Sequence, residues 1–246
     1  MLLWWMLGFS VLGSIGAIGG AAVVLVASDT MRKRLLPCLL SYATGTLLGA
    51  AFLGMIPTAL RQAAPTTVSA NVLAGLVLFF VLEKLVIWRH CHDDECEEHR
   101  GAASVILLGD AFHNFLDGVA IAAAFLTSVP LGVATSLAVI AHEVPQEVGD
   151  FAILLHGGYS KRRAFAYNLL SSTATVPGAL LGYLFLDEAR LLTPFFLAVS
   201  AASFIYVAMA DLVPHLRRQL GLRSLAAQSA LLLAGIATIA AFRMLL

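Results

Sequence analysis

The sequence is dominated by long apolar stretches, each close to the length needed to cross a lipid bilayer. A transmembrane helix needs about 20 mainly apolar residues. Such stretches lie at about 3–27, 36–60, 70–89, 104–126, 130–155, 163–186, 192–213 and 224–245. Only 12% of the residues are charged and 60% are hydrophobic, whereas a soluble domain carries about 25% charged residues. We therefore predict an all-α integral membrane protein, a single bundle of eight transmembrane helices.

The segments between these stretches are short. They leave no room for a separate soluble domain, so residues 1–246 are predicted to form one transmembrane domain. Its most polar connection is a loop at about 89–101 that is rich in His, Cys and acidic residues. This loop could catch a metal ion or could simply be a solvated charged segment, and both interpretations stay open.

Basic residues fall in or beside alternate connections, and this alternation predicts the orientation of the chain. Cytoplasmic loops collect Lys and Arg, and most basic residues follow the first, third, fifth and seventh stretches: Arg32, Lys33, Arg34, Lys84, Arg89, Arg100, Lys161, Arg162, Arg163, Arg217, Arg218 and Arg223. Only Arg61, Arg190 and Arg243 fall on the other side. We therefore expect both termini outside the cytoplasm, in what we expect to be the bacterial inner (cell) membrane.

The first stretch has no basic segment before it and continues past residue 20. It is therefore expected to be a retained span and not a cleaved signal peptide. Trp4 and Trp5 suit an interfacial aromatic belt. Glycines at 13, 16 and 19, and again at 45 and 49, have the small-residue spacing that lets membrane helices pack closely.

Ionisable residues concentrate in two of the predicted spans. An ionisable group inside a span costs roughly 2.5–3.5 kcal/mol on insertion scales, so it usually faces a cavity, a partner or an ion. In the span at 104–126, one helical face carries Asp110, His113, Asn114 and Asp117. In the span at 130–155, one line carries His142, Gln146 and Gly149, and a neighbouring line carries Glu143, Glu147 and Asp150.

These two faces offer mixed nitrogen and oxygen ligands. The candidates are two imidazoles, three carboxylates and two amide oxygens, from His113, Asn114, Asp117, His142, Glu143, Gln146 and Glu147. Zinc or ferrous iron accepts such a set, and the lack of cysteine suits an ion that must also leave. Pro145 is expected to kink its helix and to free the carbonyl of Ala141. The alternative interpretation is a buried hydrogen-bonded network without metal.

The segments His113-Asn-Phe-Leu-Asp-Gly118 and His142-Glu-Val-Pro-Gln-Glu-Val-Gly-Asp-Phe151 resemble the ZIP (Zrt-, Irt-like protein) family of metal transporters. The second is similar to the signature H-E-x-P-H-E-x-G-D-F of one ZIP subfamily. The resemblance implies transport of a divalent transition metal toward the cytoplasm, with adjacent metal sites between the fourth and fifth helices. It implies one site from His113, Asp117, His142 and Gln146. A second site would use Asn114, Glu143 and Glu147.

The sequence departs from the family pattern at several positions. Gln146 stands where the subfamily usually has His, and a neutral amide is a weaker zinc ligand. Leu116 and Asp117 stand where many members have Pro and Glu. The segment Gly54–Ala59 resembles the family segment H-L-L-P-E-A but lacks its His and Glu, although Met55 offers a thioether.

A rival function is an intramembrane zinc metalloenzyme, because His142-Glu143-Val-Pro-Gln146 is one residue from H-E-x-x-H. Gln146 removes the second ligand, so we expect a transporter and no enzyme. We expect no cofactor; the metal is the transported ion, zinc first, with Fe²⁺, Cd²⁺ and Mn²⁺ as alternatives. The lipid bilayer is the other partner. We expect no nucleic-acid partner, and a homodimer is left open.

Overall fold

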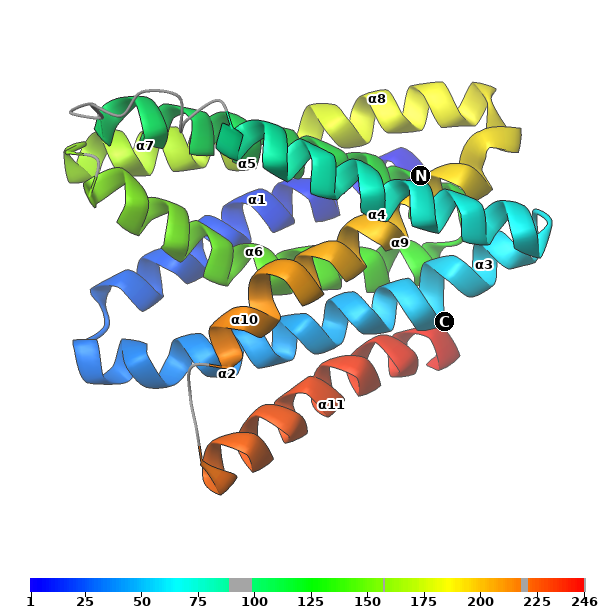
Figure 1. Cartoon of the computed structure of the whole chain (residues 1–246). Helices are drawn as coiled ribbons and strands as arrows, with labels where there is room; N and C mark the ends of the chain where they lie inside the picture. Colours follow the sequence, from blue (N-terminus) through cyan, green and yellow to red (C-terminus); the bar gives the residue numbers. More distant parts are fainter. Residues whose placement is uncertain (89–98, 157, 218–220, 246) are drawn as a thin grey trace.

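The computed structural model describes residues 1–88, 99–156, 158–217 and 221–245, and its regular structure there is helical (Figure 1). Eight helical segments correspond to the eight predicted spans. In chain order they are α1 (Leu2–Val26); α2 (Asp29–Gly49) with η1 (Ala50–Met55) and α3 (Ile56–Leu60); α4 (Pro65–Trp88); α5 (His99–Thr127); α6 (Val129–His156); α7 (Lys161–Ser172) with α8 (Thr175–Glu188); η2 (Arg190–Leu192) with α9 (Thr193–Tyr206), η3 (Val207–Leu212) and α10 (Val213–Leu216); and α11 (Leu222–Leu245). The predicted metal-catching loop at about 89–101 lies outside the described side chains.

Six of the segments are long and apolar enough to cross a membrane. The other two, α5 and α6, are the helices that carry the polar faces. In the most apolar part of Thr30–Leu60, 61% of the residues are buried, whereas only 11% are buried in the most apolar parts of Pro65–Leu85 and Leu222–Phe242. Because exposed apolar surface on such helices is what a bilayer covers, α4 and α11 are peripheral.

The two termini lie on the same side of the bundle in Figure 1. The beginnings of α2, α7 and α11, which carry or adjoin most of the basic residues, gather at the opposite end. The basic residues after α1 lie inside the first turns of α2 and not in a loop, because Ser28 caps that helix by accepting a hydrogen bond from the Met31 amide at 3.3 Å.

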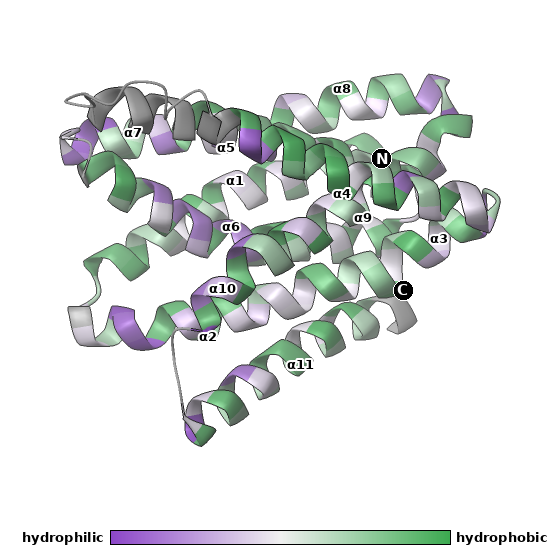
Figure 2. Cartoon of the chain, viewed as in Figure 1, coloured by the Kyte–Doolittle hydropathy of each residue, from purple (hydrophilic) through white to green (hydrophobic). Residues whose placement is uncertain are grey.

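The bundle is held by pairs of closely packed helices. α5 packs against α6 and α8, α1 packs against α6, α2 packs against α11, and α4 packs against α9. Figure 2 shows apolar residues along most of the spans and a hydrophilic stretch in the middle of α6. A large apolar cluster includes Leu47, Ile121, Phe125, Leu197 and Phe204, and Asn114, Asp117, His142, Glu143 and Glu147 are at most 1% exposed. The polar faces of α5 and α6 are therefore enclosed by protein.

Two spans contain a wider helical turn just before a proline. η1 precedes Pro57 and η3 precedes Pro214. Proline cannot donate a backbone hydrogen bond, and its ring crowds the preceding turn of the helix. A wider, π-type turn accommodates both the missing hydrogen bond and the crowding. α6 contains Pro145 but runs unbroken from Val129 to His156. The kink predicted there does not interrupt the helix.

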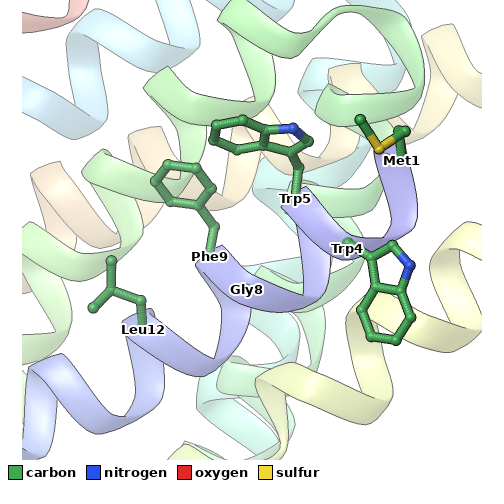
Figure 3. Close-up of a pocket in the computed structure, with 6 residues that line it drawn as sticks. All are labelled: Met1, Trp4, Trp5, Gly8, Phe9 and Leu12. Carbon is green, nitrogen blue, oxygen red and sulfur yellow. The ribbon is translucent and has the colours of Figure 1, made fainter.

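The two tryptophans of the predicted interfacial belt lie at the beginning of α1. Trp4 and Trp5 are 73% and 52% exposed, and Figure 3 shows Trp5 on the same side as Phe9, with which it stacks at a centroid distance of 6.1 Å. The residues around them form a shallow apolar groove with Met1, Gly8 and Leu12. This position at a helix end agrees with the predicted interfacial belt.

The glycines expected to mediate helix packing differ in their surroundings. A Cβ atom at Gly45 would lie 2.0 Å from the carbonyl oxygen of Leu232 on α11, whereas nothing lies within 4 Å of such an atom at Gly16. Gly45 therefore sits at a close backbone contact between α2 and α11. Gly16 does not.

We predict that Gly45→Ala lowers the stability of the protein by about 1–3 kcal/mol, because the added methyl group must push two backbones apart. The matched control Gly16→Ala keeps or slightly raises stability, because alanine favours a helix. Thermal unfolding of the purified protein in detergent measures both. Equal melting temperatures for Gly45→Ala and the wild type would contradict the close α2–α11 contact.

Candidate metal centre

Four ionisable side chains converge where α5 and α6 cross. His113 and Asp117 lie one turn apart on α5, and His142 and Glu143 are consecutive on α6. One ligand atom from each lies within 4.8 Å of all the others. We call these four residues the histidine cluster. Residues four apart on a helix share a face, which is why the sequence pattern alone could indicate them.

The contacts in the histidine cluster centre on two imidazole nitrogens. His113 Nε2 lies 3.2 Å from His142 Nε2. His142 Nε2 lies 3.1 Å from Asp117 Oδ2 and 3.4 Å from Glu143 Oε1. His113 Nε2 lies 3.7 Å from each of these two oxygens. All five separations therefore fall in a narrow range.

These separations match the edges of a metal coordination polyhedron. Ligand atoms at about 2.0–2.1 Å from a tetrahedral zinc ion lie roughly 3.3–3.4 Å apart. The separations of 3.1–3.7 Å in the histidine cluster bracket that value. The residues present thus fit a zinc-sized divalent ion without a large rearrangement.

The backbone fixes which nitrogen of His142 faces the cluster. His142 Nδ1 lies 3.0 Å from the carbonyl oxygen of Ala138, one turn earlier on α6. Because a carbonyl only accepts, Nδ1 carries the hydrogen and donates it, and the lone pair of the neutral ring lies on Nε2. A second hydrogen bond of this kind is the usual way in which proteins orient a metal-ligating histidine.

The carboxylate oxygens of the cluster are buried and lack hydrogen-bond partners. The side chains of Asp117 and Glu143 are 1% and 2% exposed. The imidazole nitrogen of His142 lies beside Asp117 Oδ2 and Glu143 Oε1, and Glu143 Oε2 has no hydrogen-bond partner. A buried carboxylate without a partner is costly, so these atoms need a cation. His113 is 16% exposed and is the most exposed member of the cluster.

The other predicted ligands lie beside the histidine cluster. Gln146 Nε2 and Asn114 Nδ2 both donate to Asp110 Oδ1 at 3.1 Å. Glu147 is fully buried, and both of its carboxylate oxygens lack hydrogen bonds. The structure therefore brings Asn114, Gln146 and Glu147 into the same polar layer, while four of the seven predicted residues form the tight group.

Helices α7, α8 and α9 close this layer. Thr175 Oγ1, at the beginning of α8, lies 2.9 Å from Asn114 Oδ1 and donates to it. Asn168 Nδ2 on α7 donates to the carbonyl oxygen of Glu147 at 2.9 Å. The ring of Phe204 on α9 meets His142 edge-on at a centroid distance of 6.0 Å. Asn168 on α7 and Thr175 on α8 belong to the sixth predicted span. Their hydrogen bonds therefore help to orient the polar faces of α5 and α6.

Sequence reasoning did not assign Asp110 to the site, although this residue lies on the same helical face as His113. The signal was available, because Asp110 stands three residues before His113 and four before Asn114. In the structure the amides of Asn114 and Gln146 both donate to it. Other polar residues of the spans pair elsewhere. Tyr206 donates to Glu83, and His215 Nδ1 lies 2.8 Å from the carbonyl oxygen of Asp211.

Comparison with known proteins places the site in a family. Residues 88–243 match a family model described as ZIP Zinc transporter. Over 129 residues the chain is 40% identical to the human zinc transporter ZIP10, and the alignment covers 51% of this chain and 16% of that protein. It is 43% identical over 114 residues to the zinc transporter foi of Drosophila melanogaster, covering 46% and 16%. It is 46% identical over 110 residues to human zinc transporter ZIP4, covering 45% and 17%.

The chain thus spans about a sixth of the length of these relatives. They are named as transporters, and none of the three is named as an enzyme, which agrees with the expectation that the chain is not a metalloenzyme. The matched region includes α5, α6 and every residue of the histidine cluster. The chain is an integral membrane protein that belongs to the ZIP zinc transporter family.

Proposed function

We propose that this chain carries a divalent transition metal ion, zinc first, across the membrane toward the cytoplasm, through the histidine cluster between α5 and α6. One observation carries the proposal. Four ligand atoms from two helices lie within 4.8 Å of one another inside an apolar bundle. Ionisable groups at this depth mark ion pathways by default.

The ligand chemistry favours zinc. Two imidazole nitrogens and two carboxylate oxygens suit zinc or ferrous iron, whereas manganese prefers oxygen alone. The compared relatives are named zinc transporters. Fe²⁺, Cd²⁺ and Mn²⁺ stay alternatives from the sequence. Asn114, Gln146 and Glu147 stay predicted ligands, next to the four residues of the tight group.

In the proposed cycle the ion enters from the side of the two termini and exchanges water for the ligands of the histidine cluster. His142 is held ready by its bond to Ala138, so binding does not require that ring to turn. Binding needs deprotonated ligands, and Asp117 and Glu143 supply charge that offsets that of the ion. The ion then leaves toward the ends of α5 and α6 that adjoin the basic connections.

The orientation is part of the proposal. The positive-inside rule places the basic ends of α2, α7 and α11 in the cytoplasm and both termini outside it. The bacterial inner membrane and a homodimer stay predictions from the sequence, since the compared relatives are animal proteins.

The orientation predicts the behaviour of reporter fusions. Alkaline phosphatase fused after residue 246 is expected to be active and green fluorescent protein at the same place dark, because the C-terminus is proposed to lie outside the cytoplasm. Fusions in the connection between α6 and α7 are expected to give the reverse pattern. A fluorescent C-terminal fusion would place the C-terminus in the cytoplasm and would contradict the proposed orientation and direction of transport.

The histidine cluster predicts a graded loss of zinc affinity. His142→Ala and Asp117→Ala are expected to weaken zinc binding by about 10- to 100-fold or more. Loss of a group that only hydrogen-bonds to a metal ligand already lowers metal affinity by about this factor. Gln146→Ala is expected to cost less, because its amide contacts Asp110. Titration calorimetry on purified protein measures this order. If Gln146→Ala costs as much as His142→Ala, then Gln146 binds the ion directly.

Transport is tested by zinc uptake into proteoliposomes that contain equal amounts of each protein. The wild type is expected to fill the vesicles, and His113→Ala and His142→Ala are expected to reduce the initial rate by about tenfold or more. Asp187→Asn, which changes an exposed ion pair with Arg190, is the matched control and is expected to behave as wild type. Uptake by all variants at the wild-type rate would refute the pathway, and no uptake by the wild type would refute transport of zinc.

A further inference from the structure

We propose that the groove between the end of α10 and the beginning of α11 binds an anionic phospholipid, with the phosphodiester beside Arg217 and the acyl chains along α11. We call it the α10–α11 groove. It is lined by nine described residues, among them Leu216, Arg217, Leu225, Ser229 and Leu232, and its volume is about 770 Å³. Ligand sites in proteins have volumes of about 300–1,000 Å³. The groove is therefore large enough for a ligand.

The chain turns sharply between the two helices that form the groove. Gly221 has a φ of 130°, which residues with a side chain rarely adopt, and α11 begins at the next residue. Gln228 Nε2 lies 3.5 Å from the carbonyl oxygen of Leu216, so the second turn of α11 reaches the end of α10. Five of the nine lining residues are Leu or Val. The groove is therefore mainly apolar.

The length of the groove matches one leaflet of a bilayer. Leu222, Leu225, Ser229 and Leu232 follow one another at spacings of three, four and three residues. They therefore lie on one face of α11. The ten residues from 222 to 232 advance about 15 Å along the helix, which is half of a hydrocarbon core about 30 Å thick. This face can accompany an acyl chain from the headgroup level to the middle of the membrane.

The same face is open to the surroundings of the bundle. Leu222 and Leu225 are 85% and 60% exposed. In the most apolar part of Leu222–Phe242, only 11% of the residues are buried. Exposed apolar surface on a membrane-spanning helix is covered by the bilayer. An occupant of the groove therefore comes from the bilayer, which favours a lipid over a soluble ligand.

Charge at one end of the groove favours an anionic lipid. Arg217 is exposed and is the charged member of the lining. Among the nine described residues that line the groove, none is acidic. The sequence contains no Asp or Glu after Asp211, whereas it has three arginines within residues 217–223. Basic groups between transmembrane helices bind anionic headgroups, so the phosphodiester is expected beside Arg217.

A groove on α4 provides a contrast. Its volume is about 570 Å³, and the six residues that line it, between Ala70 and Val81, are Ala, Val or Leu. Such a surface accepts acyl chains, but it has no charged group that could distinguish one headgroup from another. The α10–α11 groove combines an apolar face with a cationic end. Its expected signature is therefore a preference for one headgroup charge and not simply contact with lipid.

The test measures lipid retention by native mass spectrometry on the purified full chain. Dioleoylphosphatidylglycerol and dioleoylphosphatidylcholine are titrated separately, because they share their acyl chains and differ in net charge. The wild type is expected to retain phosphatidylglycerol about fivefold more tightly, which is the contribution of one arginine near a membrane surface. Arg217→Gln is expected to remove this preference. The matched control Arg162→Gln removes an exposed charge at the beginning of α7, at the same end of the bundle (Figure 1), and is expected to behave as the wild type.

A second variant tests the apolar part of the groove. Ser229→Trp fills the groove without changing its charge, and it is expected to lower retention of phosphatidylglycerol to the level of Arg217→Gln. Glycerol 3-phosphate, a soluble phosphate ester without acyl chains, is expected not to displace the lipid. Melting temperatures in lipid-free detergent show whether each variant is folded.

Four outcomes would overturn the proposal. The wild type could retain both lipids equally, Arg162→Gln could lower retention as much as Arg217→Gln, or Ser229→Trp could retain the lipid as the wild type does. Displacement by glycerol 3-phosphate would indicate a site for a soluble phosphate ester. A dimer that takes up no phosphatidylglycerol is a form of the first outcome and would assign the groove to a second copy of the chain. None of these measurements involves zinc, so their result is separate from that of the proposed function.

Discussion

The structure depends on the burial of carboxyl groups between α5 and α6. Asp110, Asp117, Glu143, Glu147 and Asp150 are at most 9% exposed, and each has at least one oxygen without a hydrogen bond. An unpaired carboxylate in a medium of low dielectric costs several kcal/mol. A bound cation would offset this cost, and the rest of the fold holds the carboxylates of Asp117 and Glu143 next to the imidazoles of His113 and His142.

Close helix packing provides this support. A Cβ atom at Gly118 on α5 would lie 2.1 Å from the carbonyl oxygen of Thr175, so α5 and α8 meet backbone to backbone directly beside Asp117. The same approach lets Thr175 reach the amide of Asn114. Small residues thus place a polar side chain of one helix at the polar face of another, and the packing and the chemistry of the site depend on the same contacts.

Much of the fold and of the site could be predicted from the sequence, because both follow from periodicity. Apolar length gave the eight helical segments, and spacings of three, four and seven residues put His113 on the face that also carries Asp117. Periodicity does not show where an amide points. Asn114 and Gln146 were predicted as ligands through their amide oxygens, and the structure adds that their nitrogens donate to Asp110. The partner of the Gln146 nitrogen depends on the distance between two helices. Likewise, Pro145 indicated a kink, and α6 continues through this position from Val129 to His156.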